Sequence, residues 1–207
     1  IENMQNGIAK RKGDKGSFVK VLRLANISDN SIDASEMRQI QLTEKEKETY
    51  TLNINDIVMI RVNGSKENVA RQILVEEKNE WAFCDHIIRI VVKSDILPAF
   101  MVLFTKTNNY RYYIDEHMVS SAGQNTISRK GMSELRIPLP TIPEQRQIIR
   151  MVDNVVEKEK DVMCRITQVT KQIDMLKKSI LAKAFRGELE TNDLKDESSV
   201  ELLKTIL

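Results

Sequence analysis

Residues 138–189 read PLPTIPEQRQIIRMVDNVVEKEKDVMCRITQVTKQIDMLKKSILAKAFRGEL, and this stretch predicts one long helix. Thr141 and Glu144 have the spacing of a capping box, with Pro143 in the first turn, where a missing N–H costs nothing. Gly187 is predicted to end the helix as a C′ residue. About 43 residues at 1.5 Å each would give a rod of roughly 65 Å, too long for a core element of a small globular domain.

Apolar residues recur along this helix in alternating steps of four and three, which is the repeat of a coiled coil. The positions of this seam are Ile148, Val152, Val155, Glu159, Val162, Ile166, Val169, Ile173, Leu176 and Ile180. A second stripe, Ile149, Val156 and Met163, widens the apolar face in the first half. We expect the first two turns to pack on the chain's own domain. The rest of the seam should pair with a helix from a second copy or from a missing half.

The composition is typical of one globular domain with an appendage, since 41% of the 207 residues are hydrophobic. The fold class predicted is α+β, a mixed α/β domain followed by one long coiled-coil-forming helix. The domain should span residues 1–140 and the helix 141–187, with a polar linker and a short helix in 188–207. Because the sequence starts at Ile1, we expect either a fragment of a longer protein or a single-domain form.

Apolar runs bounded by turn residues predict the strands of the domain at 18–24, 57–62, 73–75, 81–84 and 87–92. Capping residues predict short helices after Thr43, Ser94 and Ser128. Residues 110–114 fit either a strand or a helix. Asn63-Gly64 is a turn signal, and 120–128 has the polar composition of a loop.

The cysteines and the hydropathy indicate the cellular compartment of the protein. Cys84 and Cys164 lie far apart and show neither a disulfide framework nor zinc-ligand spacing, as expected in a reducing cytoplasm. No apolar run approaches the ~20 residues of a membrane span, and no signal peptide is visible. We therefore expect a cytoplasmic protein without a membrane partner.

Catalytic motifs are missing from the sequence. The prolines, at 98, 138, 140 and 143, allow neither the Asn/Asp-Pro-Pro-aromatic nor the Pro-Cys element of a DNA methyltransferase. Neither GxxxxGK[ST] nor GxGxxG occurs. The sequence therefore predicts no enzymatic activity, no cofactor and no metal site.

Several residue sets could still mimic a catalytic site. Asp56, Glu76 and Lys78 resemble the acidic set of a metal-dependent nuclease, but such spacing is common by chance. Ser17 and Lys20 share the S-x-x-K spacing without any supporting motif. Cys84-Asp85-His86 holds a nucleophile, an acid and a base, but neighbours in a strand point to opposite faces and should not form a triad. His86 and His117 lack the spacing of metal ligands.

Three polar and basic loops suggest contact with nucleic acid. Their residues are Lys10, Arg11, Lys12 and Lys15 in the first loop, Arg61, Asn63, Ser65, Lys66 and Arg71 in the second, and Gln124, Asn125, Thr126, Arg129 and Lys130 in the third. Arg, Asn and Gln pair with base edges, whereas Lys and Ser suit phosphates. The candidates for base contact are Arg61, Asn63, Gln124 and Asn125. The alternative is ordinary solvated loops and, for Arg61, a structural ion pair at the strand end.

Several segments of the sequence are similar to those of a known family. They are PLPTIPEQRQII and SILAKAFRGEL of the helix, the tail DLKDESSVELLKTI, and VLRLANISDNSID, INDIVMIRVNGS, FCDHIIRI and SSAGQNTIS of the domain. In these segments the chain resembles the specificity subunits of type I restriction–modification systems. Family members normally carry two recognition domains, each followed by a long helix, and the two helices pair antiparallel. This chain has one domain and one helix.

The resemblance implies a non-catalytic subunit that reads half of a split target in double-stranded DNA. The helix would set the separation of the half-sites. Methyltransferase subunits would dock on it, and restriction/translocase subunits would complete the complex. One alternative is a coiled-coil adaptor whose globular head binds a protein. The other is a stand-alone methyltransferase, which the missing methyltransferase motifs disfavour.

Overall fold

The computed structural model describes residues 1–10, 12–13, 15–28, 31–189 and 204. Contacts divide the chain into two compact units, Ile1–Val152 and Asp153–Leu207. The first unit therefore includes the first turns of the long helix. The short helix predicted near residues 199–207 lies outside the described residues, apart from Lys204.

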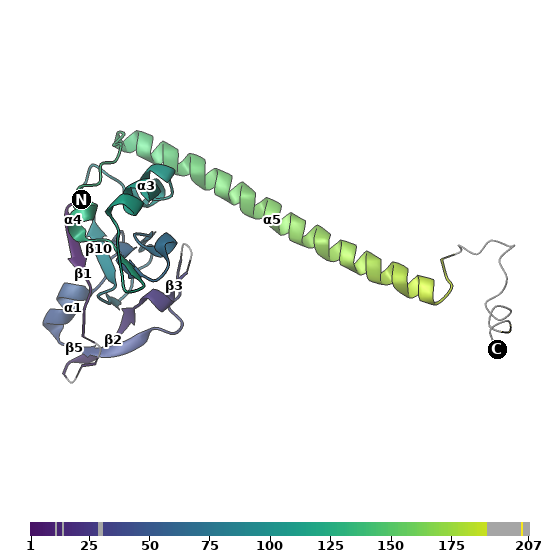
Figure 1. Ribbon diagram of the computed structural model, residues 1–207, viewed down its shortest axis with the longest axis horizontal. Helices are drawn as coiled ribbons and strands as arrows, with labels where there is room; N and C mark the ends of the chain where they lie inside the picture. Colours follow the sequence, from purple (N-terminus) through teal and green to yellow (C-terminus); the bar gives the residue numbers. More distant parts are fainter. Residues whose placement is uncertain (11, 14, 29–30, 190–203, 205–207) are drawn as a thin grey trace. The chain divides into compact units, whose positions relative to one another are not determined.

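A four-stranded antiparallel sheet forms the centre of the first unit (Figure 1). Its strands, in spatial order, are β1 (Asn3–Asn6), β10 (Ile87–Val91), β6 (Ile57–Ile60) and β8 (Gln72–Leu74). Every residue of β6 is buried. A strand covered on both faces needs apolar side chains on both, which explains the unbroken run Ile-Val-Met-Ile.

Smaller sheets complete the unit. One has the order β5-β2-β9, with β2 (Ser17–Leu22) antiparallel to β5 (Arg38–Leu42) and parallel to β9 (Ala82–Phe83). A second pairs β3 (Ile27–Ser28) with β4 (Ser31–Ile32). The third has the order β11-β12-β7, from β11 (Val119–Ser121), β12 (Gln124–Thr126) and β7 (Val62–Asn63).

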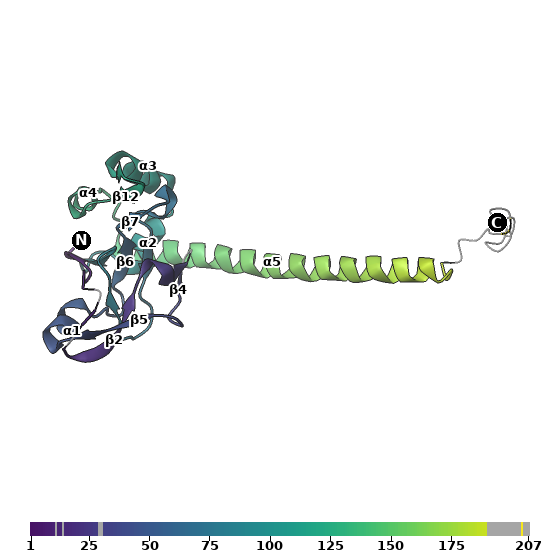
Figure 2. The ribbon, with the colours of Figure 1, turned by 60° about the horizontal axis from the view of Figure 1, so that its bottom comes forward.

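Short helices lie around these sheets. They are α1 (Glu44–Tyr50), α2 (Pro98–Phe104), α3 (Asn108–His117) and α4 (Arg129–Ser133), with 3-10 turns η1 (Leu24–Asn26) and η2 (Lys66–Asn68). Within the unit, α3 and α4 lie at one end and α1, β2 and β5 at the other (Figures 1 and 2).

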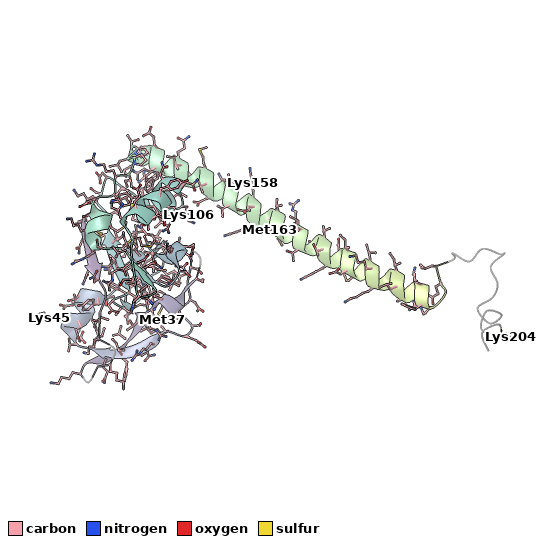
Figure 3. All side chains as sticks on the ribbon, viewed as in Figure 1. Met37, Lys45, Lys106, Lys158, Met163 and Lys204 are labelled. Carbon is pink, nitrogen blue, oxygen red and sulfur yellow. The ribbon has the colours of Figure 1, made fainter. Side chains whose placement is uncertain are left out.

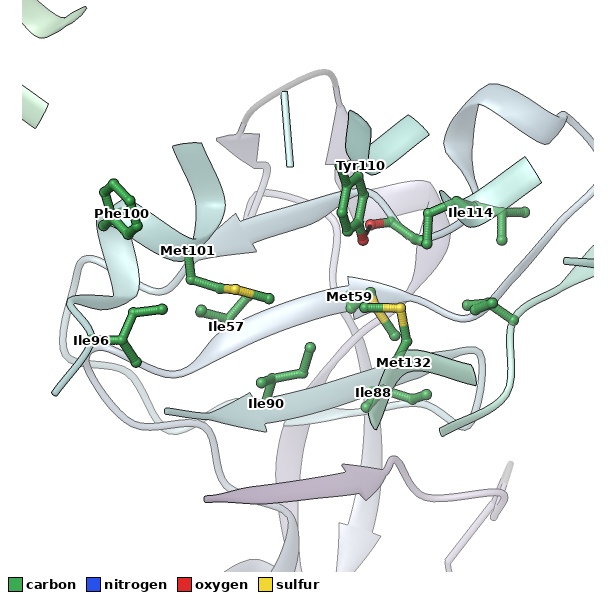
Figure 4. Packing of buried hydrophobic residues seen from close by; sticks show 13 residues of the cluster. Ile57, Met59, Ile88, Ile90, Ile96, Phe100, Met101, Tyr110, Ile114 and Met132 are labelled. Carbon is green, nitrogen blue, oxygen red and sulfur yellow. Dashed lines mark hydrogen bonds between the residues drawn. The ribbon is translucent and has the colours of Figure 1, made fainter. Parts of the chain in front are cut away.

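The largest apolar core lies between one face of the central sheet and the helices α2 and α3. Ile57, Met59 and Ile90 from the sheet share this core with Met101 of α2 and Tyr110 of α3 (Figure 4). The opposite face of the same sheet carries Val58, Ile73 and Ile87, which pack in a second core with Leu22 and Phe83. The two cores together hold the central strands in place.

The long helix α5 spans Ile142–Phe185. At its start the Glu144 carboxylate accepts hydrogen bonds from the Thr141 N–H (2.8 Å) and hydroxyl (2.7 Å). At its end Gly187 has φ 69° and donates to the Ala184 carbonyl, while the Glu188 N–H reaches the Lys183 carbonyl. This pair of bonds is a Schellman motif, so both ends confirm the predicted signals.

Within the described residues no helix is long and apolar enough to cross a membrane.

The sequence predicted the remaining elements with some errors. The helix after Ser94 begins at Pro98 without a side-chain cap, so the cap prediction is wrong. Most of 120–128, predicted as a loop, belongs to the hairpin of β11 and β12, which spans 119–126, and 110–114 are helical. The Thr43 and Ser128 caps are confirmed by hydrogen bonds from the Glu46 and Gly131 N–H groups.

Candidate nucleic-acid interface

The hairpin β11–β12 brings together the second and third predicted loops, those of Asn63 and Gln124. β12 pairs with β7, so that Asn125 lies opposite Asn63 and Thr126 opposite Val62. At the tip of the hairpin Ala122 and Gly123 have φ values of 47° and 75°. Two central residues with positive φ make a type I′ turn, whose twist matches paired strands. Backbone pairing therefore brings the Asn63 turn and the Gln124 segment onto one surface.

The buried side chain of Asn125 stabilises the pairing of the hairpin with the Asn63 turn. Its side chain is buried, its NH2 group donates to the carbonyls of Gly64 (2.8 Å) and Asn63 (3.4 Å), and its Oδ1 accepts from the Ser120 hydroxyl (2.6 Å). Both ends of the amide are thus engaged within the protein. Asn125 fits a structural role better than the base contact predicted for it.

The turn after β7 presents the second loop. The Asn63 Oδ1 accepts a hydrogen bond from the Ser65 N–H (2.9 Å), which closes an Asx turn. Ser65 and Lys66 are exposed, and Lys66 begins η2. Arg71 is half-buried beyond that turn and has an interaction of its own within the protein. The Asn63 oxygen is thereby committed, and its NH2 is the part of the amide suited to an acceptor on a base.

Arg61 links the turn to the middle of the domain. Its Nε donates to the Asp85 carbonyl (3.0 Å), and its backbone N–H donates to the His86 carbonyl (2.8 Å). The alternative proposed for Arg61 was a structural ion pair, and the structure shows instead a hydrogen bond to a backbone oxygen. Arg61 is half-buried, and these contacts fix its stem beside the 84–86 turn.

The third set lies on the hairpin and on α4. Gln124, Arg129 and Lys130 are exposed, and Thr126 is half-buried in β12. The Arg129 guanidinium donates to the Met4 carbonyl (3.2 Å), which ties α4 to β1. The exposed members are available to a ligand.

In the first loop, Lys10 and Gly13 lie against other elements. Lys10 forms an ion pair with Glu46 of α1 (3.2 Å), and a Cβ on Gly13 would meet the Gln41 carbonyl of β5. Lys12 and Lys15 are exposed, whereas Arg11 lies outside the described residues. The structure therefore joins the second and third loops directly, and it places Lys10 of the first loop at α1 and Gly13 at β5.

Cys84-Asp85-His86 differs from the sequence expectation. Cys84 forms a β-bridge with Ile8, and Asp85 and His86 form the turn before β10. The ligand atoms of the three residues all lie within 4.8 Å of one another, with His86 Nδ1 3.1 Å from Asp85 Oδ1. The prediction that alternation would separate them is wrong, because a turn does not alternate. Burial raises the pKa of the Cys84 thiol, which disfavours the thiolate that a nucleophile or metal ligand needs.

Asp56 has a structural environment. Its carboxylate accepts from the Asn53 N–H (2.8 Å) and lies 3.9 Å from Arg89, while burial raises its pKa. Arg89 also donates to the carbonyl of Thr51 and to the Gln5 side chain. This half-buried network accounts for Asp56 without a nuclease role.

The seam of α5 is exposed after the first turns. The side chains of Ile148 and Ile149 pack against the larger core, as expected for the first two turns. Beyond them Ile166 is 52% exposed and Ile173 46% exposed. Met163 of the second stripe is also exposed, and its side chain projects from the helix in Figure 3.

Gln145 anchors α5, and the sequence did not suggest it. Its side chain is fully buried, accepts from the Leu97 N–H (2.8 Å) and donates to the carbonyls of Asp95 (2.9 Å) and Pro140 (2.8 Å). The only hint was a polar residue between Glu144 and the apolar face, a pattern common on exposed helix turns.

Comparison with known proteins assigns this chain to a family. A family model described as "Type I restriction modification DNA specificity domain" matches residues 6–171. The specificity subunit of the type I restriction enzyme StySPI from Salmonella potsdam is 36% identical over 89% of this chain and 40% of its own length. That of EcoKI from Escherichia coli K12 is 26% identical over 91% of this chain and 41% of its own. The chain thus spans about two fifths of these curated relatives.

A solved structure supports the fold independently. A chain from a study of complex assembly in a type I restriction–modification system covers 90% of this chain and 44% of its own, with a TM-score of 0.63 and 16% identity. The mixed α/β domain and the long helix therefore recur in a structure of that system. With the family model spanning most of the sequence, the chain belongs to the type I restriction–modification DNA specificity domains.

Proposed function

We propose that this chain reads one half of a bipartite site in double-stranded DNA and carries no catalysis of its own. The observation that carries the proposal is the pairing of β12 with β7, which sets the Asn63 turn and the Gln124 segment side by side. Amide donors beside the exposed Lys66 combine groups that recognise bases with a group that binds phosphate.

Within this proposal the second part of α5 is a spacer that pairs with another helix. Its exposed apolar seam supports such a partner, because a row of isoleucines and valines in water is unfavourable. The partner would be a second copy or the remainder of a longer subunit. The second stripe, with Val156 and Met163, would then contact a methyltransferase subunit, and restriction/translocase subunits would complete the assembly.

A protein-binding adaptor is the second candidate. The same exposed seam favours it, since a coiled coil can carry any globular head. The polar character of the hairpin surface favours DNA instead, because an interface with a protein usually has an apolar centre. A head that shows no affinity for duplex DNA at any salt concentration would favour the adaptor.

The deciding experiment compares variants of the reading surface in the assembled complex. Asn63→Asp keeps the oxygen that closes the Asx turn but removes the NH2 donor. It should cost roughly 1–3 kcal/mol on the cognate duplex beyond its effect on scrambled DNA. Asn79→Asp is the control for the added charge, because Asn79 closes a similar turn to the Trp81 N–H (3.0 Å). The Asn79 NH2 also donates to the Glu77 carbonyl (3.0 Å), so the thermal midpoint of this variant is measured alongside.

Lys66→Ala should behave differently from Asn63→Asp. Losing a phosphate contact should weaken binding to all sequences alike and lower the salt slope by ~1. Gln124→Ala should resemble Asn63→Asp and lower selectivity. If none of these variants changes affinity or selectivity, this surface does not face DNA.

A further inference from the structure

The Arg111 side chain of α3 reaches the Lys66 turn, which comprises residues 65–70. Its Nη1 donates to the carbonyls of Lys66 (3.2 Å) and Val69 (3.5 Å). The other two nitrogens of the guanidinium, Nε (3.1 Å) and Nη2, donate to the Asp115 carboxylate one turn further along the helix. Arginine can serve both sides at once because its N–H donors form a planar fork. All three nitrogens of Arg111 therefore have partners within the protein.

Tyr110, the residue before Arg111, holds the end of the same turn. Its hydroxyl donates to the Ala70 carbonyl (2.6 Å) and accepts from the Gln72 side chain (3.2 Å). Ala70 has φ 63°, a left-handed conformation that costs free energy in a residue with a Cβ. Tyr110 itself packs in the larger core together with Ile114 (Figure 4). The buried face of α3 therefore connects the turn to the core of the domain.

The Lys66 turn has few apolar anchors of its own. Its first helical turn, η2, contains no buried residue, and burial begins only with Val69 and Ala70. A segment with little buried apolar surface opens readily unless other contacts hold it. The hydrogen bonds from α3 are such contacts, and a substitution in α3 can remove them without changing the turn itself.

The helix α3 is connected to both sides of the proposed reading surface. Along the chain it leads, after a single residue, into β11, whose partner β12 pairs with β7. Through Arg111 it also contacts the Lys66 turn, which follows β7. Without the Arg111 bonds Lys66 could shift relative to the hairpin while the hairpin stays paired. Recognition needs side chains held in fixed positions, so such a shift would lower selectivity.

We propose that Arg111 is a positioning residue for recognition. It fixes the Lys66 turn against α3 and leaves contact with the ligand to other side chains. The recognition part of this inference rests on the proposed function, whereas the fixing of the turn rests on the hydrogen bonds alone. Arg111 itself is assigned no phosphate, because its nitrogens are engaged within the protein.

The first arm of the test measures amide hydrogen exchange in the 207-residue chain by NMR. The N–H groups of Asn68, Val69 and Arg71 donate to carbonyls of the Lys66 turn and report its opening. Arg111→Gln should speed their exchange about tenfold, while the amides of β6 and β10 keep their rates. Arg111→Lys keeps the charge but cannot reproduce the fork, so its turn should exchange as fast as that of Arg111→Gln.

Arg165→Gln is the matched control. Arg165 forms an ion pair with Asp161, four residues away on α5 (2.9 Å), so this variant loses the same charge and the same kind of pair. Exchange in the Lys66 turn should not change. Thermal midpoints of all variants check that the first unit is folded. If neither Arg111 variant speeds exchange in the turn, the proposal is wrong.

The second arm compares cognate and scrambled duplexes in the assembled complex across a salt series. Arg111→Gln and Arg111→Lys should each lower the ratio of the two affinities roughly tenfold and leave the salt slope unchanged. A slope that falls by ~1 in Arg111→Gln and recovers in Arg111→Lys would make Arg111 a phosphate contact and overturn the positioning role.

The Asn63→Asp variant separates this inference from the proposed function. If Asn63→Asp lowers selectivity and both Arg111 variants retain it, recognition does not need the fixed turn, and the positioning role is overturned while the proposed function stands. If Asn63→Asp also leaves selectivity unchanged, the proposed function fails. Faster exchange in the Arg111 variants would then still support the fixing of the Lys66 turn.

Discussion

The two parts of α5 have the same apolar spacing and opposite surroundings. In residues 142–152 the apolar face packs on the domain, and the fully buried Gln145 fixes the helix to the segment before α2. In residues 153–185 the same repeat is exposed, with Ile166 at 52%. A heptad repeat therefore predicts that a face will be covered, but not which molecule covers it.

The largest expected effect falls on the covered part. Gln145→Ala would leave the Leu97 N–H and two carbonyls without their partners, and the free energy of unfolding of the first unit should fall by roughly 2–4 kcal/mol. Urea denaturation measures it. Gln147→Ala, at an exposed position of the same helix, should stay within about 0.5 kcal/mol of the wild type. Equal effects at both positions would contradict the anchoring role of Gln145.

A substitution in the exposed part of α5 should change the association of the helix and leave the stability of the domain unchanged. Ile166→Asp places a charge in the seam and should abolish pairing of the helix, seen by analytical ultracentrifugation, while the unfolding of the first unit stays unchanged. Gln168→Asp adds the same charge outside the seam and should not alter association. If Ile166→Asp changes neither the association state nor the thermal midpoint of the long helix, the seam is not an interface.

Glu159 should have a smaller and opposite effect. It is the single carboxylate in the seam, and a polar seam residue can fix the register of paired helices at a cost in stability. Glu159→Leu should raise the thermal midpoint of the paired helix by a few degrees and loosen the choice of register or partner. Glu157→Leu, off the seam, is the control. Disulfide crosslinking between cysteines introduced on the paired helices would report a change of register.

The smallest effect concerns the cap that starts the covered part. Hydrogen bonds from Thr141 lower the pKa of Glu144 below its ordinary value of 4.5. The cap therefore stabilises the helix above that pH, and this contribution disappears as the pH falls through the lowered pKa. The thermal midpoints of wild type and Glu144→Gln should differ at neutral pH and converge in acid. A difference that persists in acid would show that ionisation of Glu144 is not the cause.

Local signals in the sequence predicted much of the fold. Thr43, Ser128, Thr141 and Gly187 act through neighbours within a few residues, so their roles could be inferred without tertiary structure. The apolar run of β6 was equally plain. The hairpin of β11 and β12 was missed because it has little apolar alternation and turns on Ala122-Gly123, which lacks the usual Asn-Gly signal.

The candidate site was harder to predict, because its geometry depends on contacts distant in sequence. Composition identified Asn63 and Asn125 as polar loop residues but could not show that one presents its amide while the other buries it.

The way in which the hairpin is held has a consequence for how specificity can evolve. Backbone pairing with β7 and the amide of Asn125 keep β11 and β12 in place, while most of the remaining side chains on the hairpin point to solvent. Exposed substitutions away from caps and special backbone conformations usually alter stability by less than about 0.5 kcal/mol. Mutation can therefore sample many surfaces on an unchanged scaffold. Under the proposed function, a lineage could acquire a new recognition sequence without first passing through an unstable protein.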